Sequence, residues 1–228
     1  MDTCVPAADD RARGLADRDR SAAGAPARPA CRVTAYEEEL LRLLVRLSYF
    51  REPGKQFRLA SGRMSDYYIE CSLTTTNPAA IPLIGALVHA RVPAEAVAIG
   101  GPTMGADPIA AAVAFHSAGT GHPVAWFSVR KAAKEHGAAR WLEGSAKPGD
   151  TVVVVEDVIT SGASLIEAVR KCREEGLRVR RAIVLVDREE DGGCARAEKA
   201  LAEVGGDFEA LFTRGQLERA WQAARRCS

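Results

Sequence analysis

The feature that most constrains the fold is a run of β-branched residues, Thr151–Val155, followed directly by two acids and a small polar turn. Continuous runs of this kind are typical of a strand that helices cover on both faces of a parallel sheet. Open α/β sheets bind their ligands at the carboxyl ends of such strands. The stretch Thr151–Ser164, TVVVVEDVITSGAS, therefore predicts a central strand that ends at a binding site.

Glu156 and Asp157 place two carboxylates at the predicted end of this strand, and the turn Thr160–Ser164 opens an apolar helix over Leu165–Cys172. Free backbone N–H groups and the helix dipole favour an anion at such a helix start. We call Thr160–Ser164 the cradle and predict that it binds phosphate, with the acids available for sugar hydroxyls or a metal. The alternatives are that a cradle hydroxyl serves only as an N-cap and that the acids form a solvated strand end.

The cradle is neither a Walker loop nor a dinucleotide-binding fingerprint, because GxxxxGK[ST] and GxGxxG are both missing from the sequence. It resembles the motif with which type I phosphoribosyltransferases bind phosphoribosyl pyrophosphate (PRPP). That resemblance implies a central parallel sheet flanked by helices, with a small β-containing hood near the N-terminus.

Composition narrows the functional class. The chain has 228 residues, enough for one domain with a full core, and its 31 basic against 30 acidic side chains leave a net charge of +1. With this near balance, the chain as a whole has no electrostatic field that would attract nucleic acid or a membrane surface. The six cysteines are scattered without metal-ligand spacing, and no apolar run approaches the roughly 18 residues of a membrane helix. We expect a cytoplasmic protein with reduced thiols that binds neither nucleic acid nor membrane.

The chain divides into an extension over residues 1–33 and a folded domain over residues 34–228. The extension is rich in Ala, Arg, Asp, Gly and Pro and has few large apolar side chains, so we expect it to be disordered. Thr34 and Glu37 have the spacing of a capping box, which predicts that the first helix begins there.

Strand and helix signals alternate through the domain. A hairpin is predicted from Phe57–Leu59 and Asp66–Glu70, and it would form the hood (residues 57–70). Further strands are expected at residues 96–99, 124–129, 141–144, 179–186 and 208–212, and helices at residues 82–89, 104–115, 195–204 and 216–225. This order predicts an α/β fold with right-handed parallel crossovers.

A second motif is the basic loop, Arg130–Gly137, whose sequence RKAAKEHG directly follows a predicted strand. Its cations suit a ligand that carries several phosphate charges, and His136 is a plausible proton donor because histidine side chains in general exchange protons near neutral pH. The alternative is a solvated loop with His136 as a bystander.

Taken together, the motifs resemble the orotate phosphoribosyltransferases from about Thr34 to the C-terminus. Those that carry the resemblance are Ala60–Arg63 with Tyr67 and Tyr68, Gly100–Pro102, the basic loop, EDVITSG, and Asp187 with Arg188. The resemblance implies transfer of ribose 5-phosphate from PRPP to orotate, with Mg²⁺ bound mainly through PRPP and no side chain of the chain assigned as a ligand to the metal. It also implies a homodimer in which the basic loop reaches the partner's site.

Site roles follow from the resemblance residue by residue. It implies catalytic roles for Glu156, Asp157, Lys131, Lys134 and His136. The implied PRPP contacts are Arg130, Lys131, Lys134, His136, Glu156, Asp157, Val158, Ile159, Thr160, Ser161, Gly162, Ala163 and Ser164. The implied orotate contacts are Thr160, Arg188, Tyr68 and Arg63. Alternatively, Arg188 forms a strand-end salt bridge and the tyrosines belong to the core.

The sequence departs from the family pattern at three places. Ala60 stands where many members have a lysine, Thr103-Met104 replaces a common Tyr-Lys pair, and Glu156 replaces the usual first Asp of the acid pair. The Thr103-Met104 change leaves open a second hypothesis, transfer to another base, and a PRPP-sensing regulator without turnover is the third.

Overall fold

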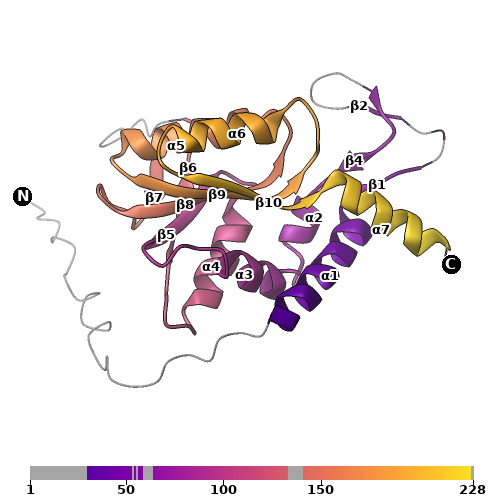
Figure 1. Ribbon diagram of the computed structural model, residues 1–228, viewed down its shortest axis with the longest axis horizontal. Coiled ribbons are helices and arrows are strands. Elements are labelled where there is room, and N and C mark those ends of the chain that lie inside the picture. The colour runs from indigo at the N-terminus through magenta and orange to yellow at the C-terminus, as the bar shows by residue number, and fades with distance from the viewer. Residues whose placement is uncertain (1–29, 53, 55, 59–63, 133–140, 227–228) are drawn as a thin grey trace, which may run out of the picture.

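The computed structural model describes residues 30–52, 54, 56–58, 64–132 and 141–226 (Figure 1). Most of the predicted N-terminal extension lies outside these ranges. So do Ala60, Arg63, Lys134 and His136, whose assigned roles remain predictions. Among the described helices, none is long and apolar enough to cross a membrane.

A six-stranded sheet forms the centre of the molecule, in the order β10-β9-β8-β5-β6-β7. Its strands are β5 (Ala98–Pro102), β6 (Ala125–Val129), β7 (Leu142–Gly144), β8 (Thr151–Ile159), β9 (Arg178–Asp187) and β10 (Asp207–Thr213). All neighbours are parallel except β7, which runs antiparallel to β6 at one edge. The predicted α/β fold with a central, largely parallel sheet is confirmed.

Strand β8 lies inside the sheet and is covered on both faces, as its β-branched run predicts. Val153 and Val155 pack into a cluster with residues of the helices α1 (Ala30–Leu47), α3 (Ile81–His89) and α4 (Asp107–Ser117). Val152 and Val154 pack into a second cluster with α5 (Ala163–Glu174) and α6 (Gly193–Ala202). The alternation follows from the two-residue period of a strand. Figure 1 shows the same two layers, with α5 and α6 on one side of the sheet and α1, α3 and α4 on the other.

The predicted helices are present with shifted ends. They are α1 (Ala30–Leu47), α3 (Ile81–His89), α4 (Asp107–Ser117), α5 (Ala163–Glu174), α6 (Gly193–Ala202) and α7 (Arg214–Arg226). The short helix α2 (Ser72–Thr75) was not predicted from the sequence. The capping box was wrong as a helix start, because α1 begins at Ala30 and Thr34 lies inside it. Ala and Arg in the added turn are good helix formers, which lets the helix extend past the capping signal.

The hood differs from the predicted hairpin. Strand β2 (Phe57–Arg58) pairs with β3 (Met64–Ser65), which lies in the segment predicted as the connector. Strand β4 (Tyr68–Ile69) pairs instead with β1 (Tyr49–Phe50), a strand that sequence periodicity missed directly after α1. The hood therefore extends to residues 49–70 and consists of two small antiparallel sheets. Two-residue strands are too short to show a period, so their pairing depends on tertiary packing.

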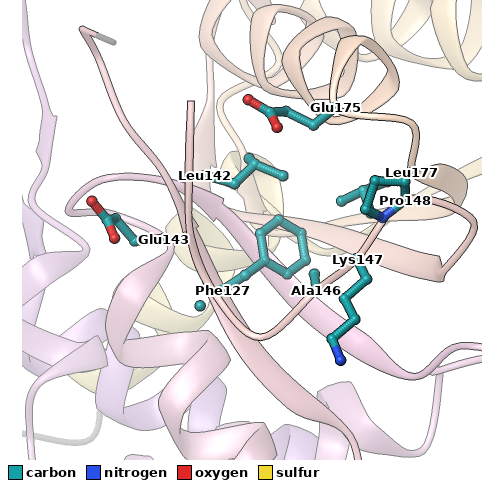
Figure 2. Close-up of a pocket in the computed structure, with 9 residues that line it drawn as sticks. Phe127, Leu142, Glu143, Ala146, Lys147, Pro148, Glu175 and Leu177 are labelled. Atoms are coloured by element: carbon teal, nitrogen blue, oxygen red, sulfur yellow. The ribbon is translucent and has the colours of Figure 1, made fainter. Parts of the chain in front are cut away.

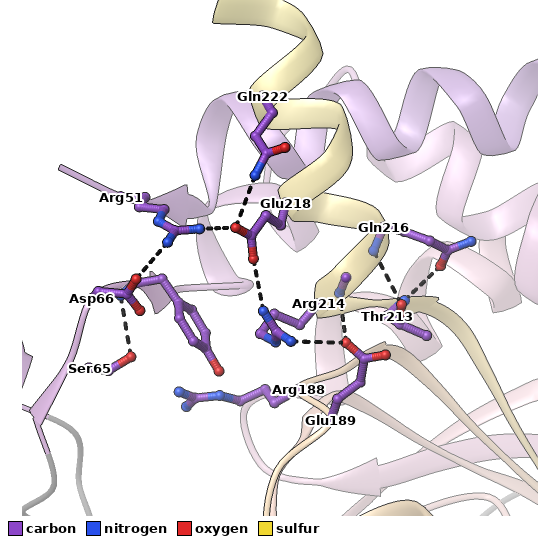
Figure 3. A network of polar contacts seen from close by, with 12 residues as sticks. Arg51, Ser65, Asp66, Arg188, Glu189, Thr213, Arg214, Gln216, Glu218 and Gln222 are labelled. Atoms are coloured by element: carbon purple, nitrogen blue, oxygen red, sulfur yellow. Dashed lines mark hydrogen bonds and ion pairs between the residues drawn. The ribbon is translucent and has the colours of Figure 1, made fainter. Parts of the chain in front are cut away.

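Helix α7 is fastened to the hood by a network of charged side chains (Figure 3). Arg51 of the hood contacts Glu218 of α7 and, at 2.6 Å, Asp66. Arg214 contacts Glu218 at 2.9 Å and Glu189, just beyond β9, at 3.6 Å. The network joins the hood, α7 and the end of β9 around one corner of the molecule.

Candidate active site

The cradle connects β8 to α5, as predicted. Its geometry depends on Gly162, which has a φ of +78° in the left-handed region and precedes the first helical residue. Gly162 occupies the N-cap, so neither Thr160 nor Ser161 does, and the N-cap alternative is wrong. Ser161 Oγ accepts one long hydrogen bond, 3.4 Å, from the Ala163 N–H. A glycine N-cap keeps the backbone open to an incoming anion at the helix start.

Glu156 and Asp157 lie within β8 rather than at its end, because the strand continues through Val158 to Ile159. The Glu156 side chain accepts a 2.5 Å hydrogen bond from Ser164 Oγ in the first turn of α5. Its second oxygen, Oε2, is buried and has no hydrogen-bond partner among the residues that the structure describes. The first acid of the pair is therefore tied to the cradle and keeps one oxygen available.

Asp157 lies against the loop that follows β5. Its Oδ1 accepts a 2.9 Å hydrogen bond from the Val158 N–H. A Cβ atom added to Gly105 would lie 2.6 Å from that same Oδ1. Only a residue without a side chain lets the loop approach the carboxylate so closely. Sequence reasoning missed Gly105, since nothing in its neighbourhood signals a contact with a strand some fifty residues away.

Burial dominates the electrostatics of both acids. It raises the pKa of Glu156 from an ordinary value of 4.5 to about 7, although the hydrogen bond from Ser164 opposes the shift. Burial also raises the pKa of Asp157, against the hydrogen bond from the Val158 N–H. A cationic group brought beside these carboxylates would be stabilised more strongly here than at the surface.

The start of the basic loop lies beside the loop after β5. Arg130 and Lys131 line a cavity of about 700 Å³ with Thr103 and Met104. Arg130 Nη1 also contacts Glu143 Oε1 on β7 at 2.9 Å. Arg130 and Lys131 therefore line the same open cavity as Thr103 and Met104, the two residues that replace the common Tyr-Lys pair of the family.

Arg188 is buried at the end of β9 and next to the cradle. Its backbone N–H donates to the Ile159 carbonyl at 3.0 Å, and its guanidinium lies 5.5 Å from the Tyr67 ring and 3.7 Å from Glu190. Within the described part of the chain, its Nε and Nη2 atoms make no hydrogen bond although both are buried. The strand-end salt bridge of the alternative is present, since Arg188 Nη2 lies within ion-pair distance of Glu190. Two buried donors still make no hydrogen bond among the described residues, and each costs free energy when it is buried without an acceptor.

The two hood tyrosines play different parts. Tyr67 is buried in the core and donates its hydroxyl to Glu190, and burial together with that bond raises its pKa to about 12. Tyr68 is half-buried, stacks on Phe57 with ring centroids 6.1 Å apart, and donates to Glu70 at 2.8 Å. The core alternative therefore holds for Tyr67, and Tyr68 keeps part of its ring accessible.

The structure brings the cradle, both acids and Arg188 to one edge of the sheet, because β5, β8 and β9 are parallel neighbours. Glu70, Glu190 and Gly105 join this edge although no sequence pattern marked them. A separate cavity of about 330 Å³ lies beside β7 and the end of α5 (Figure 2). The described residues contain no group of three or more His, Cys, Asp or Glu side chains able to hold a metal ion.

Known proteins match both the sequence and the fold. The model of the phosphoribosyl transferase domain matches residues 82–200. The orotate phosphoribosyltransferase of Aquifex aeolicus is 43% identical over 156 residues, which cover 68% of this chain and 85% of that protein.

Crystal structures of the orotate phosphoribosyltransferase of Mycobacterium tuberculosis are similar in fold. The complex with Fe(III) dicitrate has a TM-score of 0.66 and 34% identity, covering 80% of this chain and 98% of the other. The complex with PRPP has a TM-score of 0.63 and 31% identity, covering 80% and 99%. The chain described here belongs to the phosphoribosyltransferase family, among its orotate phosphoribosyltransferases.

Proposed function

We propose that the protein transfers ribose 5-phosphate from PRPP to orotate, a step of pyrimidine nucleotide synthesis. The bond from the ribose carbon to the pyrophosphate oxygen breaks, and a bond from that carbon to the orotate ring nitrogen forms. The products are orotidine 5'-monophosphate and pyrophosphate. The similar enzymes from Aquifex aeolicus and Mycobacterium tuberculosis carry the name of this activity.

The observation that carries the choice of base is that two buried donors of the Arg188 guanidinium, Nε and Nη2, make no hydrogen bond among the described residues, although Nη2 lies 3.7 Å from Glu190. An anionic ligand would accept hydrogen bonds from these donors. A planar carboxylate matches the fork of a guanidinium. Orotate carries such a carboxylate, whereas uracil and the purine bases do not.

The acids suit the ribose. As the pyrophosphate leaves, positive charge develops on the ribose ring, and a carboxylate held in a buried site stabilises it without reorganising. Asp157 and the available oxygen of Glu156 lie directly before the cradle that would hold the 5'-phosphate. The side chains beside the cradle therefore bind the sugar and stabilise the charge it develops.

Magnesium would enter mainly with PRPP. Glu156 of β8 contacts the cradle through Ser164, and the described residues supply no complete metal cage. This donor set fits an ion held chiefly by substrate oxygens, and such an ion would neutralise charge on the departing pyrophosphate. We further propose a homodimer in the cytoplasm, with the basic loop shared between subunits.

The direct test follows the loss of orotate absorbance after mixing purified protein with PRPP and Mg²⁺. We expect turnover that requires all three components and falls when EDTA is added. Uracil and adenine in place of orotate form the specificity panel, and neither should support release of pyrophosphate. Release of pyrophosphate with another base but not with orotate would overturn the proposal.

A further inference from the structure

Lys171 is a buried lysine in the third turn of α5, away from the cradle. Its side chain is only 6% exposed. Its Nζ atom donates to the backbone carbonyls of Arg130, at 2.9 Å, and Lys131, at 3.3 Å. The same ammonium lies 4.1 Å from the centroid of the Trp141 ring. The Lys171 ammonium therefore contacts both the backbone that directly follows β6 and Trp141, the residue that precedes β7.

Glu175, just past α5, reinforces this attachment. Its Oε1 accepts a 2.9 Å hydrogen bond from the Trp141 N–H, and the Trp141 carbonyl accepts one of 2.8 Å from the Arg130 N–H. Figure 2 shows Glu175 beside Leu142, the first residue of β7. The segment after β6, residues 130–131, and the segment at the start of β7, residues 141–142, are thus joined to each other and to α5.

The cost of burying an ammonium argues for a specific role. A buried lysine loses its hydration, and a side chain of similar volume without charge would often serve packing equally well. Lys171 recovers that cost through two carbonyls and an aromatic face, and Glu167 lies 3.7 Å away. These contacts fix the direction of the backbone at Arg130 and Lys131, which packing alone would not do.

We propose that Lys171 is a positioning residue that fixes the direction in which Arg130 and Lys131 lead into the basic loop, and with it the reach of the loop toward PRPP. Helix α5 carries Lys171 on a rigid element, so the loop leaves the sheet in one fixed direction, also where it reaches the site of the partner subunit. The proposal rests on the proposed function, because it assigns these two cations to the pyrophosphate end of PRPP.

The test compares Lys171→Met, Lys171→Arg and the matched control Arg170→Met. Arg170 is the preceding residue on α5 and pairs with Glu167 and Glu174 at the surface. We expect Lys171→Met to raise the KM for PRPP about tenfold while the KM for orotate stays within about twofold of wild type. Lys171→Arg should recover part of the loss, and Arg170→Met should behave as wild type.

A second pair of variants covers the case in which Lys171→Met fails to fold. Glu175→Leu removes the acceptor for Trp141, whereas Glu175→Gln keeps one, so only the leucine variant should raise the KM for PRPP. Calorimetric titration with magnesium pyrophosphate checks the same point without turnover. Weaker pyrophosphate binding in Lys171→Met would support the proposal even if orotate is not the base.

The proposal is overturned if Lys171→Met binds magnesium pyrophosphate as wild type does. It is also overturned if the KM values for PRPP and orotate rise equally, or if Arg170→Met reproduces the change. An inactive wild-type protein that binds magnesium pyrophosphate, with weaker binding in Lys171→Met, would refute the proposed function alone.

Discussion

The ribose-phosphate half of the site and its base-binding half are built in different ways. The first consists of one contiguous segment, Glu156–Ser164, in which a strand, two acids and a helix start follow one another. The second gathers Arg188 from the end of β9 and Tyr68 from the hood, with Glu190 and α7 beside them. The difference teaches that one half is a local motif and that the other exists only in the folded chain.

This difference has a kinetic consequence. Changes beside the cradle should act on kcat or on PRPP, whereas changes around Arg188 should act on orotate. Three substitutions test whether the halves separate in this way, and a fourth, Glu156→Gln, tests the electrostatics of the first half.

The largest effect is expected from Asp157→Asn. Loss of the carboxylate should lower kcat by roughly 10²- to 10³-fold, the range seen when one group that stabilises transition-state charge is removed. Stopped assays at saturating PRPP and orotate measure it. The Tm should not fall, because burial raises the Asp157 pKa and the substitution removes a buried charge. Asp66→Asn, which alters an exposed ion pair of the hood, is the control and should keep wild-type kcat.

Glu156→Gln should change the pH dependence of stability. Burial raises the pKa of Glu156 to about 7 in the folded chain, so the folded state retains a proton that the unfolded state releases above 4.5. The contribution of protonated Glu156 to the free energy of unfolding is therefore fully present below pH 4.5 and is lost as the pH rises through about 7.

Glutamine stays neutral at every pH. The free energy of unfolding of Glu156→Gln minus that of wild type should therefore be larger at about pH 8 than at about pH 5, by roughly 2 to 3 kcal/mol. Urea denaturation at both pH values measures this. Glu167→Gln, at an exposed position on α5, should show no such gain. A constant difference at both pH values would contradict the raised pKa.

Arg188→Lys tests the base-binding half. Lysine keeps the charge but loses the planar fork, so the KM for orotate should rise roughly thirtyfold while the KM for PRPP stays near wild type. Arg214→Lys is the matched control. Its guanidinium also lies 5.5 Å from the Tyr67 ring, but it is paired with Glu189 and Glu218. An equal rise in both KM values would break the separation between the halves.

The smallest effect is expected from Gly105→Ala. The new Cβ would meet Asp157 Oδ1 at 2.6 Å, so the carboxylate or the loop must shift. We expect kcat to fall about tenfold, since small displacements of catalytic groups are costly. Gly121→Ala adds its Cβ where no atom lies within 4 Å and should leave kcat unchanged. Equal rates in both variants would show that Asp157 tolerates displacement.

The sequence predicted those parts of the molecule in which one segment contains all the information. The β-branched run of β8, the cradle and the alternation of strands and helices are of this kind, and each is present. Only their ends moved: β8 runs past the acids to Ile159, and α1 begins before Thr34.

Contacts between distant segments could not be predicted in the same way. The pairing of β1 with β4, the approach of Gly105 to Asp157 and the bond from Tyr67 to Glu190 each depend on tertiary packing. No periodicity encodes them, because periodicity reports only which face a residue occupies. Arg188 was assigned to orotate by resemblance, and its unpaired donors are a property of the folded chain alone.

The network between the hood and α7 bears on how the chain is made. Arg51 must wait for Glu218, which lies 167 positions further along, before it finds that partner. A nascent chain emerging from the ribosome would therefore complete β8 and the cradle well before the corner around Arg188 closes. Because long loops close slowly and at an entropic cost, we expect the ability to bind orotate to be acquired last during biosynthesis.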